Sequence, residues 1–201
     1  MSWFIRNEDW RTYLRRYPIT SLLLAINIVV FLWMTIMGGT TNSEVLFRYG
    51  AYFKPAVLSG EWYRMFTPIF IHIGFEHLLF NCFAILIFAP GLELILGKGR
   101  YLFLYLGTGF AGFVTTFIFS DPQVIAAGAS GAIFGIYGMY AYLSRYRRDI
   151  MDRQSRQIII PILVFGVIAT FLFTGVSISG HMGGLISGYA LGRILTGGVG
   201  R

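Results

Sequence analysis

Four polar side chains that could perform chemistry stand inside otherwise apolar stretches of this 201-residue sequence. They are His77, Asn81, Ser130 and His181. A serine hydroxyl is a weak nucleophile that needs an adjacent base, and an imidazole can accept its proton near neutral pH. The sequence therefore predicts nucleophilic catalysis, with Ser130 as the nucleophile and His181 as its general base.

Attack by a serine on a carbonyl group creates a negatively charged oxygen, which fixed hydrogen-bond donors must stabilise. The amide of Asn81, the imidazole of His77 and the backbone N–H of the serine could donate to it. No acidic residue stands where it could orient His181, because Glu76 flanks the other histidine and Glu93 lies at the far end of that apolar stretch. The sequence thus predicts a Ser-His dyad without a third acidic member, and it suggests neither a metal nor an organic cofactor.

The elements that position these groups are predicted to be membrane helices. Hydrophobic residues make up 56% of the chain and charged residues 12%, whereas soluble domains carry about 25% charged residues. Six apolar stretches approach the roughly 20 residues that a helix needs to cross a bilayer. These predicted spans are 19–37, 75–96, 101–119, 127–143, 158–175 and 180–195. We therefore expect an all-α, polytopic membrane protein with a bundle of six transmembrane helices.

The expected organisation is one domain with two short flanking segments. Residues 19–195 form the predicted six-helix domain, and residues 196–201 a short cytoplasmic tail. In residues 1–18, aromatic and apolar side chains recur at near-helical spacing among arginines. This pattern predicts an amphipathic helix on the cytoplasmic membrane surface that ends at Pro18.

The basic residues predict the orientation, because cytoplasmic loops carry an excess of lysine and arginine. They cluster before the first span, between the second and third, between the fourth and fifth, and after the sixth. They are Arg6, Arg11, Arg15, Arg16, Lys98, Arg100, Arg145, Arg147, Arg148, Arg153, Arg156, Arg193 and Arg201. The opposite connections hold only Arg48, Lys54 and Arg64. Both termini are therefore expected in the cytoplasm, and a bacterial plasma membrane is the expected location.

With this topology the second, fourth and sixth spans all begin at the outer surface. His77, Asn81, Ser130 and His181 lie near those starts, so they are expected at one depth. Small residues let two membrane helices approach closely. Glycines with this spacing occur in the fourth and sixth spans, at Gly131, Gly135, Gly180, Gly184, Gly188 and Gly192. Contact between these spans would bring Ser130 within hydrogen-bond reach of His181.

Each of these groups also has a structural interpretation. Gly-Ala-Ser-Gly is commonly a helix-packing motif, and histidine or asparagine side chains can join helices through hydrogen bonds. A metal site on His72, Glu76 and His77 is disfavoured, because their spacing differs from that of zinc-binding protease helices. The stronger alternative is a transporter or a chaperone-like substrate binder, although the sequence lacks the charged midplane site that transporters often have. A binder would not need both Ser130 and His181.

The remaining charged residues are interpreted as structural. Glu61 and Arg64 lie in the aromatic external connection, residues 38–71, and are expected to hold it through hydrogen bonds. Glu93 is interpreted as a carboxylate with satisfied partners near the inner ends of the helices. The net charge of +7 does not indicate nucleic-acid binding, because the basic residues sit in short segments between apolar stretches.

Three motifs carry a resemblance to a known family. They are His-Leu-Leu-Phe-Asn at 77–81, Gly-Ala-Ser-Gly at 128–131 and His-Met-Gly-Gly-Leu-Ile-Ser-Gly at 181–188. In order and spacing they resemble the signatures of rhomboid proteases. The resemblance extends from the first span to the sixth and is similar to the minimal six-helix form. Phe134 departs from the pattern, because the family often has a tyrosine there that stacks on the histidine.

The resemblance implies an intramembrane serine endopeptidase that cleaves transmembrane segments of other membrane proteins near the outer side of the bilayer. It implies that Ser130 and His181 form the catalytic dyad, and that His77 and Asn81 stabilise the oxyanion. It also implies transmembrane protein substrates delivered through membrane lipid, without metal, cofactor or nucleic acid. An inactive rhomboid-like substrate binder is the alternative. The sequence does not indicate the oligomeric state.

Overall fold

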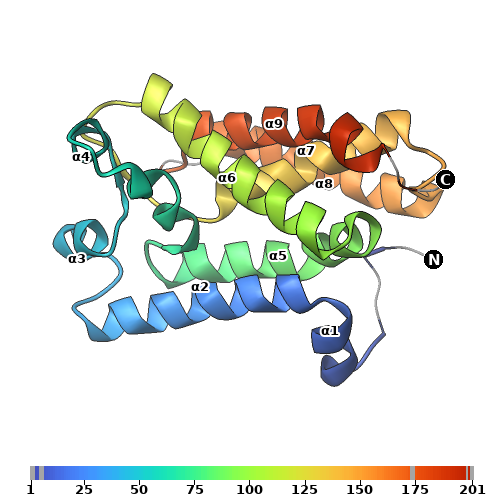
Figure 1. The fold of residues 1–201 in the computed structure, drawn as a ribbon, viewed down its shortest axis with the longest axis horizontal. Coiled ribbons are helices and arrows are strands. Elements are labelled where there is room, and N and C mark those ends of the chain that lie inside the picture. The colour runs from blue at the N-terminus through green and yellow to red at the C-terminus, as the bar shows by residue number, and fades with distance from the viewer. Residues whose placement is uncertain (1–2, 5–6, 173–174, 198, 200–201) are drawn as a thin grey trace.

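The computed structural model describes residues 3–4, 7–172, 175–197 and 199. Long helices form a bundle, and short helices lie at one end of it (Figure 1). The helices are α1 (Trp10–Arg16), α2 (Pro18–Ile36), α3 (Ser43–Arg48), α4 (Lys54–Leu58), α5 (Phe75–Leu96), α6 (Lys98–Phe119), α7 (Ser130–Tyr146), α8 (Arg153–Leu172) and α9 (Ile178–Thr196). The strands β1 (Tyr52–Phe53) and β2 (Ile125–Ala126) pair with each other, and η1 (Trp62–Met65) and η2 (Thr67–Phe70) are short 3-10 helices.

The six predicted spans correspond to α2, α5, α6, α7, α8 and α9, which confirms an all-α bundle of six long helices. Four of them, α2, α5, α6 and α8, are long and apolar enough to cross a membrane by themselves. α6 and α8 begin earlier than predicted, at Lys98 and Arg153, because their helical hydrogen bonding continues beyond the apolar stretch into charged sequence. The predicted fifth span also includes residues 173 and 174, which lie outside the described residues.

The core of the bundle is formed by α6, α7 and α9, which pack most extensively on one another. Close approach is possible because glycines face each other where α7 meets α9. A Cβ added at Gly184 would lie 2.0 Å from the carbonyl oxygen of Gly131, and one at Gly188 would lie 2.0 Å from that of Gly135. The predicted contact between the fourth and sixth spans is confirmed. By contrast, α8 lies at the periphery and has few contacts with α7 or α9.

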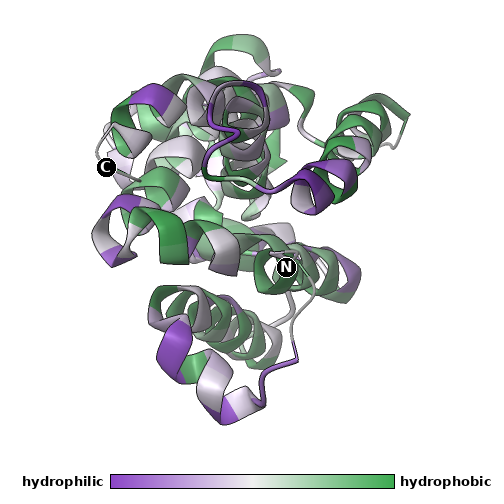
Figure 2. Ribbon diagram, turned by 90° about the vertical axis from the view of Figure 1, so that its right-hand side faces the viewer, coloured by the Kyte–Doolittle hydropathy of each residue, from purple (hydrophilic) through white to green (hydrophobic). Residues whose placement is uncertain are grey.

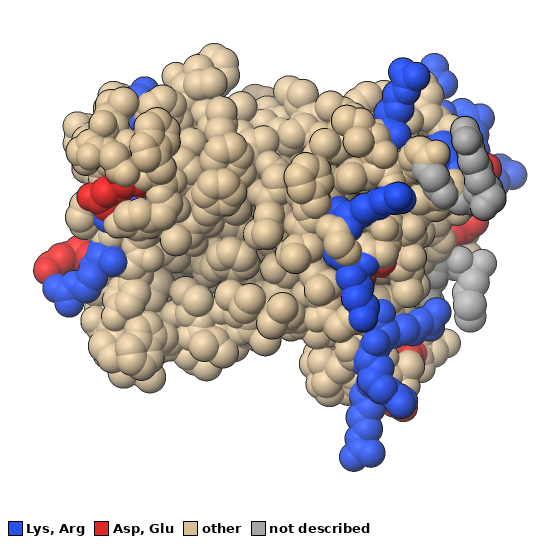
Figure 3. Space-filling view, in the orientation of Figure 1, with Lys and Arg blue, Asp and Glu red and all other residues tan. Residues whose placement is uncertain are grey.

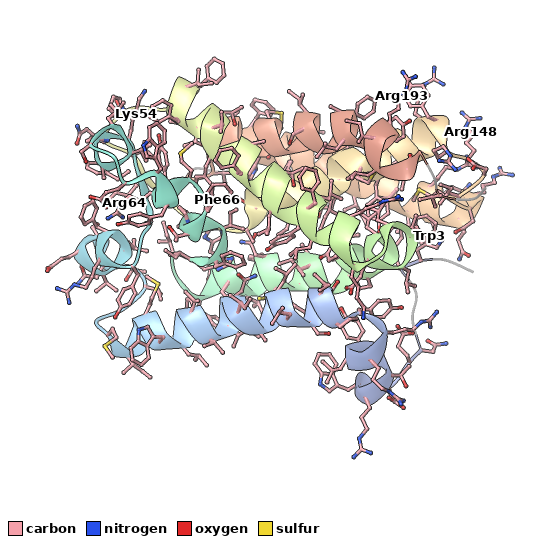
Figure 4. The ribbon with its side chains drawn as sticks, viewed as in Figure 1. Trp3, Lys54, Arg64, Phe66, Arg148 and Arg193 are labelled. Atoms are coloured by element: carbon pink, nitrogen blue, oxygen red, sulfur yellow. The ribbon has the colours of Figure 1, made fainter. Side chains whose placement is uncertain are left out.

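Charged side chains are distributed unequally between the two ends of the bundle. Lysine and arginine gather at one end, where Arg148 and Arg193 lie, while Lys54 and Arg64 lie at the other (Figures 3 and 4). Viewed from the basic end, hydrophilic residues mark the near ends of helices that are otherwise largely hydrophobic (Figure 2). The predicted segregation of basic residues is thus present in the fold. Arg6 and Arg201, which were expected in this group, lie outside the described residues.

The segment before the first span contains the predicted short helix. In α1 the Asp9 side chain caps the helix by accepting a hydrogen bond from the backbone N–H of Thr12 (2.8 Å). The helix ends at Arg16, and Pro18 begins α2, where proline needs no backbone donor. The apolar surface of α1 is divided, since Tyr13 is buried and Trp10 is exposed. The division into segments 1–18, 19–195 and 196–201 stays a prediction.

The start of α2 is tied to α5 by a buried carboxylate. Glu93 accepts hydrogen bonds from the backbone N–H groups of Ile19 and Thr20 (2.8 Å each) and from the Thr20 hydroxyl (2.7 Å). The first N–H groups of a helix have no partner within the helix and carry partial positive charge. The interpretation of Glu93 as a satisfied carboxylate is confirmed.

Replacing Glu93 with alanine is expected to lower the free energy of unfolding by about 3 kcal/mol, because it leaves the buried backbone donor of Thr20 and the part-buried one of Ile19 without a partner. Chemical unfolding in mild detergent, followed by tryptophan fluorescence, measures the loss. Glu44→Ala is the matched control. Glu44 pairs with Arg48 on the surface, with its side chain 79% exposed, so that change should stay within about 0.5 kcal/mol. Equal stability of the two variants would contradict the assigned role of Glu93.

Candidate active site

The predicted site residues lie at the starts of three helices that run in the same direction (Figure 1). His77 lies in the first turn of α5 and Asn81 one turn later, Ser130 begins α7, and His181 lies in the first turn of α9. These starts are at the end of the bundle opposite the basic side chains. The structure therefore brings all four residues to one end of the bundle, as the charge pattern predicted.

Ser130 is half-buried and follows a constrained turn. Gly128 has φ +133°, which favours glycine, and a Cβ there would lie 2.6 Å from the His77 ring. Its N–H donates to the carbonyl oxygen of Pro68 in η2 (2.8 Å). The next N–H, that of Ala129, donates to Nε2 of His72 at 3.5 Å. The turn that presents the serine is thus held by the external connection and lies against the His77 ring.

His181 is buried, and neighbours on two other helices hold its imidazole. The Phe134 ring stacks on it, with 4.0 Å between ring centroids and 16° between planes. Phe134 stands one turn after Ser130, on the same face of α7, so the imidazole lies beside the face that carries the serine. On α8, the Thr170 hydroxyl lies 2.9 Å from Nδ1. With Nδ1 engaged, Nε2 is the nitrogen left for chemistry.

The hydrogen bond expected between Ser130 and His181 is not formed among the described residues. Their helices are nevertheless in close backbone contact, since the residue after Ser130 is Gly131, which faces Gly184. In enzymes without substrate, catalytic hydrogen bonds are often long and tighten when the substrate binds. The reach of His181 to Ser130 therefore stays a prediction.

Of the two other predicted site residues, His77 lies against the serine turn, since a Cβ at Gly128 would come within 2.6 Å of its ring. Asn81 lies one turn further along α5. Asn81 is 5% exposed, and its Nδ2 donates to the carbonyl oxygen of His77 in its own helix (2.7 Å). An amide NH₂ carries two protons, so this bond leaves the second for another acceptor. His72 is fully buried and packs edge-on against His77, with 5.3 Å between ring centroids.

The external connection is held by one buried arginine. Arg64, which is 2% exposed, donates from Nη1 to the carbonyl oxygens of Phe47 (2.7 Å) and Ala51 (3.0 Å), and from Nε to Glu61 (2.7 Å). Hydrogen bonds from Tyr63 and Arg64 lower the pKa of the Glu61 carboxyl. Figure 4 shows Arg64 within this connection, away from the basic end. The interpretation of Glu61 and Arg64 as residues that hold the connection is confirmed.

This connection also supports the segment before α7. β1 and β2 are antiparallel, with Tyr52 opposite Ala126 and Phe53 opposite Ile125. The pairing and the Pro68 hydrogen bond together fasten the chain just before Ser130.

Within the described ranges, no group of three or more histidine, cysteine, aspartate or glutamate side chains could hold a metal ion.

Thr170 is the site residue that sequence reasoning missed. A threonine in an apolar helix usually bonds only to its own backbone, so the sequence around Thr170 does not by itself indicate a functional role. Two signals could have identified it. Thr170 and Thr174 are the only polar side chains in the predicted span 158–175, and they lie near its expected outer end, just before the span that bears His181.

Comparison with known proteins identifies relatives that are named as rhomboid proteases. A family model described as the Rhomboid domain matches residues 59–198. The Bacillus subtilis protein YdcA, named as a candidate rhomboid protease, is 37% identical over 189 residues, covering 94% of each chain. GluP of the same species, named a rhomboid protease, is 38% identical over 170 residues, covering 85% of this chain and 33% of GluP. The rhomboid-type serine protease 2 of Emericella nidulans is 33% identical over 142 residues, covering 69% of this chain and 27% of that protein.

Proposed function

This chain belongs to the rhomboid family and is an intramembrane serine protease, and we propose that Ser130 and His181 form its catalytic dyad. The observation that carries the proposal is the stacking of Phe134 on His181. It ties the imidazole to the face of α7 on which Ser130 stands, while Thr170 occupies Nδ1 and leaves Nε2 for the serine proton.

The reaction follows from these roles. Nε2 of His181 takes the hydroxyl proton as Oγ of Ser130 attacks the carbonyl carbon of a substrate peptide bond. The tetrahedral intermediate collapses when the imidazolium gives that proton to the leaving amine, and an ester remains on the serine. Water then attacks the ester with the histidine again as base, and this releases the acid and restores the hydroxyl.

The oxyanion requires donors next to the serine turn. We assign this role to the His77 imidazole, which lies against Gly128, and to the second N–H of the Asn81 amide. The backbone N–H of Ser130 begins α7 and has no partner within its own helix, so it is the third donor. Together they provide preorganised dipoles in a site that helices shield from water.

The substrates are proposed to be transmembrane segments of other membrane proteins, which reach the site through lipid. A helix must unwind locally before its backbone carbonyl can meet a nucleophile, so segments with small or helix-breaking residues are favoured. The site lies opposite the basic end, and basic segments face the cytoplasm. Cleavage is therefore assigned to the outer side of a bacterial plasma membrane, with both termini in the cytoplasm.

Labelling with a fluorescent fluorophosphonate tests the dyad directly. The purified wild-type protein should be labelled on Ser130, as located by mass spectrometry of its peptides, and His181→Ala should not be labelled. Ser187→Ala is the matched control, because Ser187 also lies on α9 but its hydroxyl donates to the carbonyl oxygen of Gly184 (2.9 Å). Absence of labelling in lipid as well as in detergent would instead support an inactive substrate binder.

Replacing Asn81 with alanine should lower kcat about 10²- to 10³-fold, the usual effect of losing one oxyanion donor. Cleavage of a transmembrane reporter in proteoliposomes gives kcat and KM separately, and KM should change little because the oxyanion exists only after attack. Cys82→Ala, at the neighbouring half-buried position, should retain wild-type rates. An Asn81→Ala variant that also retains them would remove Asn81 from the oxyanion site.

A further inference from the structure

The helix with the weakest packing in the bundle contributes one side chain to the candidate base. Over its described length α8 buries only Ser155, Ile159 and Thr170. Ser155 accepts a hydrogen bond from the backbone N–H of Trp3 (2.9 Å) at the basic end. Thr170 is 2% exposed near the opposite end, and it is the polar group of α8 that reaches His181.

The hydrogen bonds of Thr170 determine which nitrogen of His181 carries the proton. Oγ1 of Thr170 lies 2.9 Å from the carbonyl oxygen of Gly166 and 2.9 Å from Nδ1 of His181. A hydroxyl has one proton, and a carbonyl oxygen can only accept. The hydroxyl must therefore donate to Gly166 and accept from an Nδ1–H. A neutral imidazole protonated on Nδ1 has its free lone pair on Nε2, which is the form that a general base needs.

We propose that Thr170 is the positioning residue of the catalytic base, holding His181 in the tautomer whose Nε2 can accept the serine proton. The inference rests on the proposed dyad and assigns to a hydroxyl on α8 the orienting task that a carboxylate performs in Ser-His-Asp enzymes. A buried carboxylate would have to be desolvated, which is unfavourable for a charged group. A threonine whose own proton is satisfied by Gly166 provides a neutral acceptor without that cost.

The same bond links the base to α8. Phe134 covers one face of the imidazole and prevents it from tilting, but a stacked ring leaves rotation within the ring plane free. The Thr170 hydroxyl restrains that rotation, because it fixes the direction of the Nδ1–H. Two contacts of different kinds, from α7 and α8, thus orient the imidazole of α9.

Enzyme kinetics test the inference through a conservative pair of variants. Thr170→Val keeps the shape and removes the hydroxyl, and it should lower kcat about tenfold, the effect of one lost hydrogen bond, with KM unchanged. Thr170→Ser keeps the hydroxyl and should restore kcat to near the wild-type value. Thr35→Val is the control, because the exposed Thr35 makes the same backbone bond, to Phe31 (2.8 Å), without a histidine. Wild-type kcat in Thr170→Val, or equal loss in the serine variant, would overturn the inference.

The tautomer can be read independently of catalysis. The chain has 3 histidines, so ¹⁵N-histidine labelling gives few signals, and His181→Ala identifies those of His181. The wild-type protein should show a protonated Nδ1 and an unprotonated Nε2, and Thr170→Val should populate the other tautomer. A wild-type Nε2–H would overturn the inference. Recording the spectra in the Ser130→Ala background separates the two proposals, since loss of the dyad assignment would not alter the His181 signals.

Discussion

Ser130→Ala is expected to abolish cleavage of a transmembrane reporter while the protein still inserts and folds. The loss should be about 10⁴-fold or more, because no other group can form the acyl-enzyme. His181→Ala should cause a loss of similar size. Since the two residues act as one unit, the double variant should be no slower than either single variant. Rates in proteoliposomes, with the amount of folded protein measured in each preparation, test these expectations.

Two further measurements distinguish a loss of catalysis from a loss of folded protein. Ser130 is half-buried and begins α7, so removing its hydroxyl should leave the thermal unfolding temperature nearly unchanged. Ser187→Ala provides a serine change on the adjoining helix that should keep full activity. A Ser130→Ala protein that cleaves at the wild-type rate would exclude the dyad. A multiplicative loss in the double variant would show that the two residues act separately.

The second large effect concerns Gly184, at one of the two closest backbone approaches of α7 and α9. A Cβ at this position would lie 2.0 Å from the carbonyl oxygen of Gly131, and backbone cannot yield as a flexible side chain can. Gly184→Ala should therefore separate the helices and lower the free energy of unfolding by about 3 kcal/mol. A shift of about 1 Å between reacting groups can cost 10²-fold in rate, so activity per folded molecule should also fall.

The matched control is Gly107→Ala on α6, where an added Cβ meets nothing within 4 Å. Alanine favours the helix over glycine by about 1 kcal/mol, so this variant should be as stable as the wild type or more stable. Unfolding in detergent and reporter cleavage are measured on both variants. Wild-type stability of Gly184→Ala would mean that the two helices do not depend on this contact.

The helices, and the end of the bundle at which the candidate site lies, could be predicted from sequence because both depend on local properties. Apolar stretches correspond to helices whatever their neighbours, and basic residues mark one end of each. Hence His77, Ser130 and His181 could be assigned to one end before any contact was known. The glycine spacing in the last span likewise predicted its close approach to α7.

The remaining features depend on contacts between distant parts of the chain. Nothing in the sequence around Arg64 specifies that it donates to Phe47 and Ala51, or that β1 pairs with β2. The Thr170 contact was missed for a similar reason. A single hydroxyl has no periodicity, and its role depends on the angle between α8 and α9, which hydropathy does not encode.

The glycine-rich core helices α7 and α9 depend on each other, and this dependence affects when the site can form during synthesis. Neither α7 nor α9 is among the described helices that are long and apolar enough to cross a membrane alone, so we expect their extensive packing on each other to stabilise them in lipid. α9 also follows α7 in the order of synthesis. A nascent chain therefore carries Ser130, the proposed nucleophile, before His181, the proposed base. We expect the proposed dyad to form only after α9 has packed against α7.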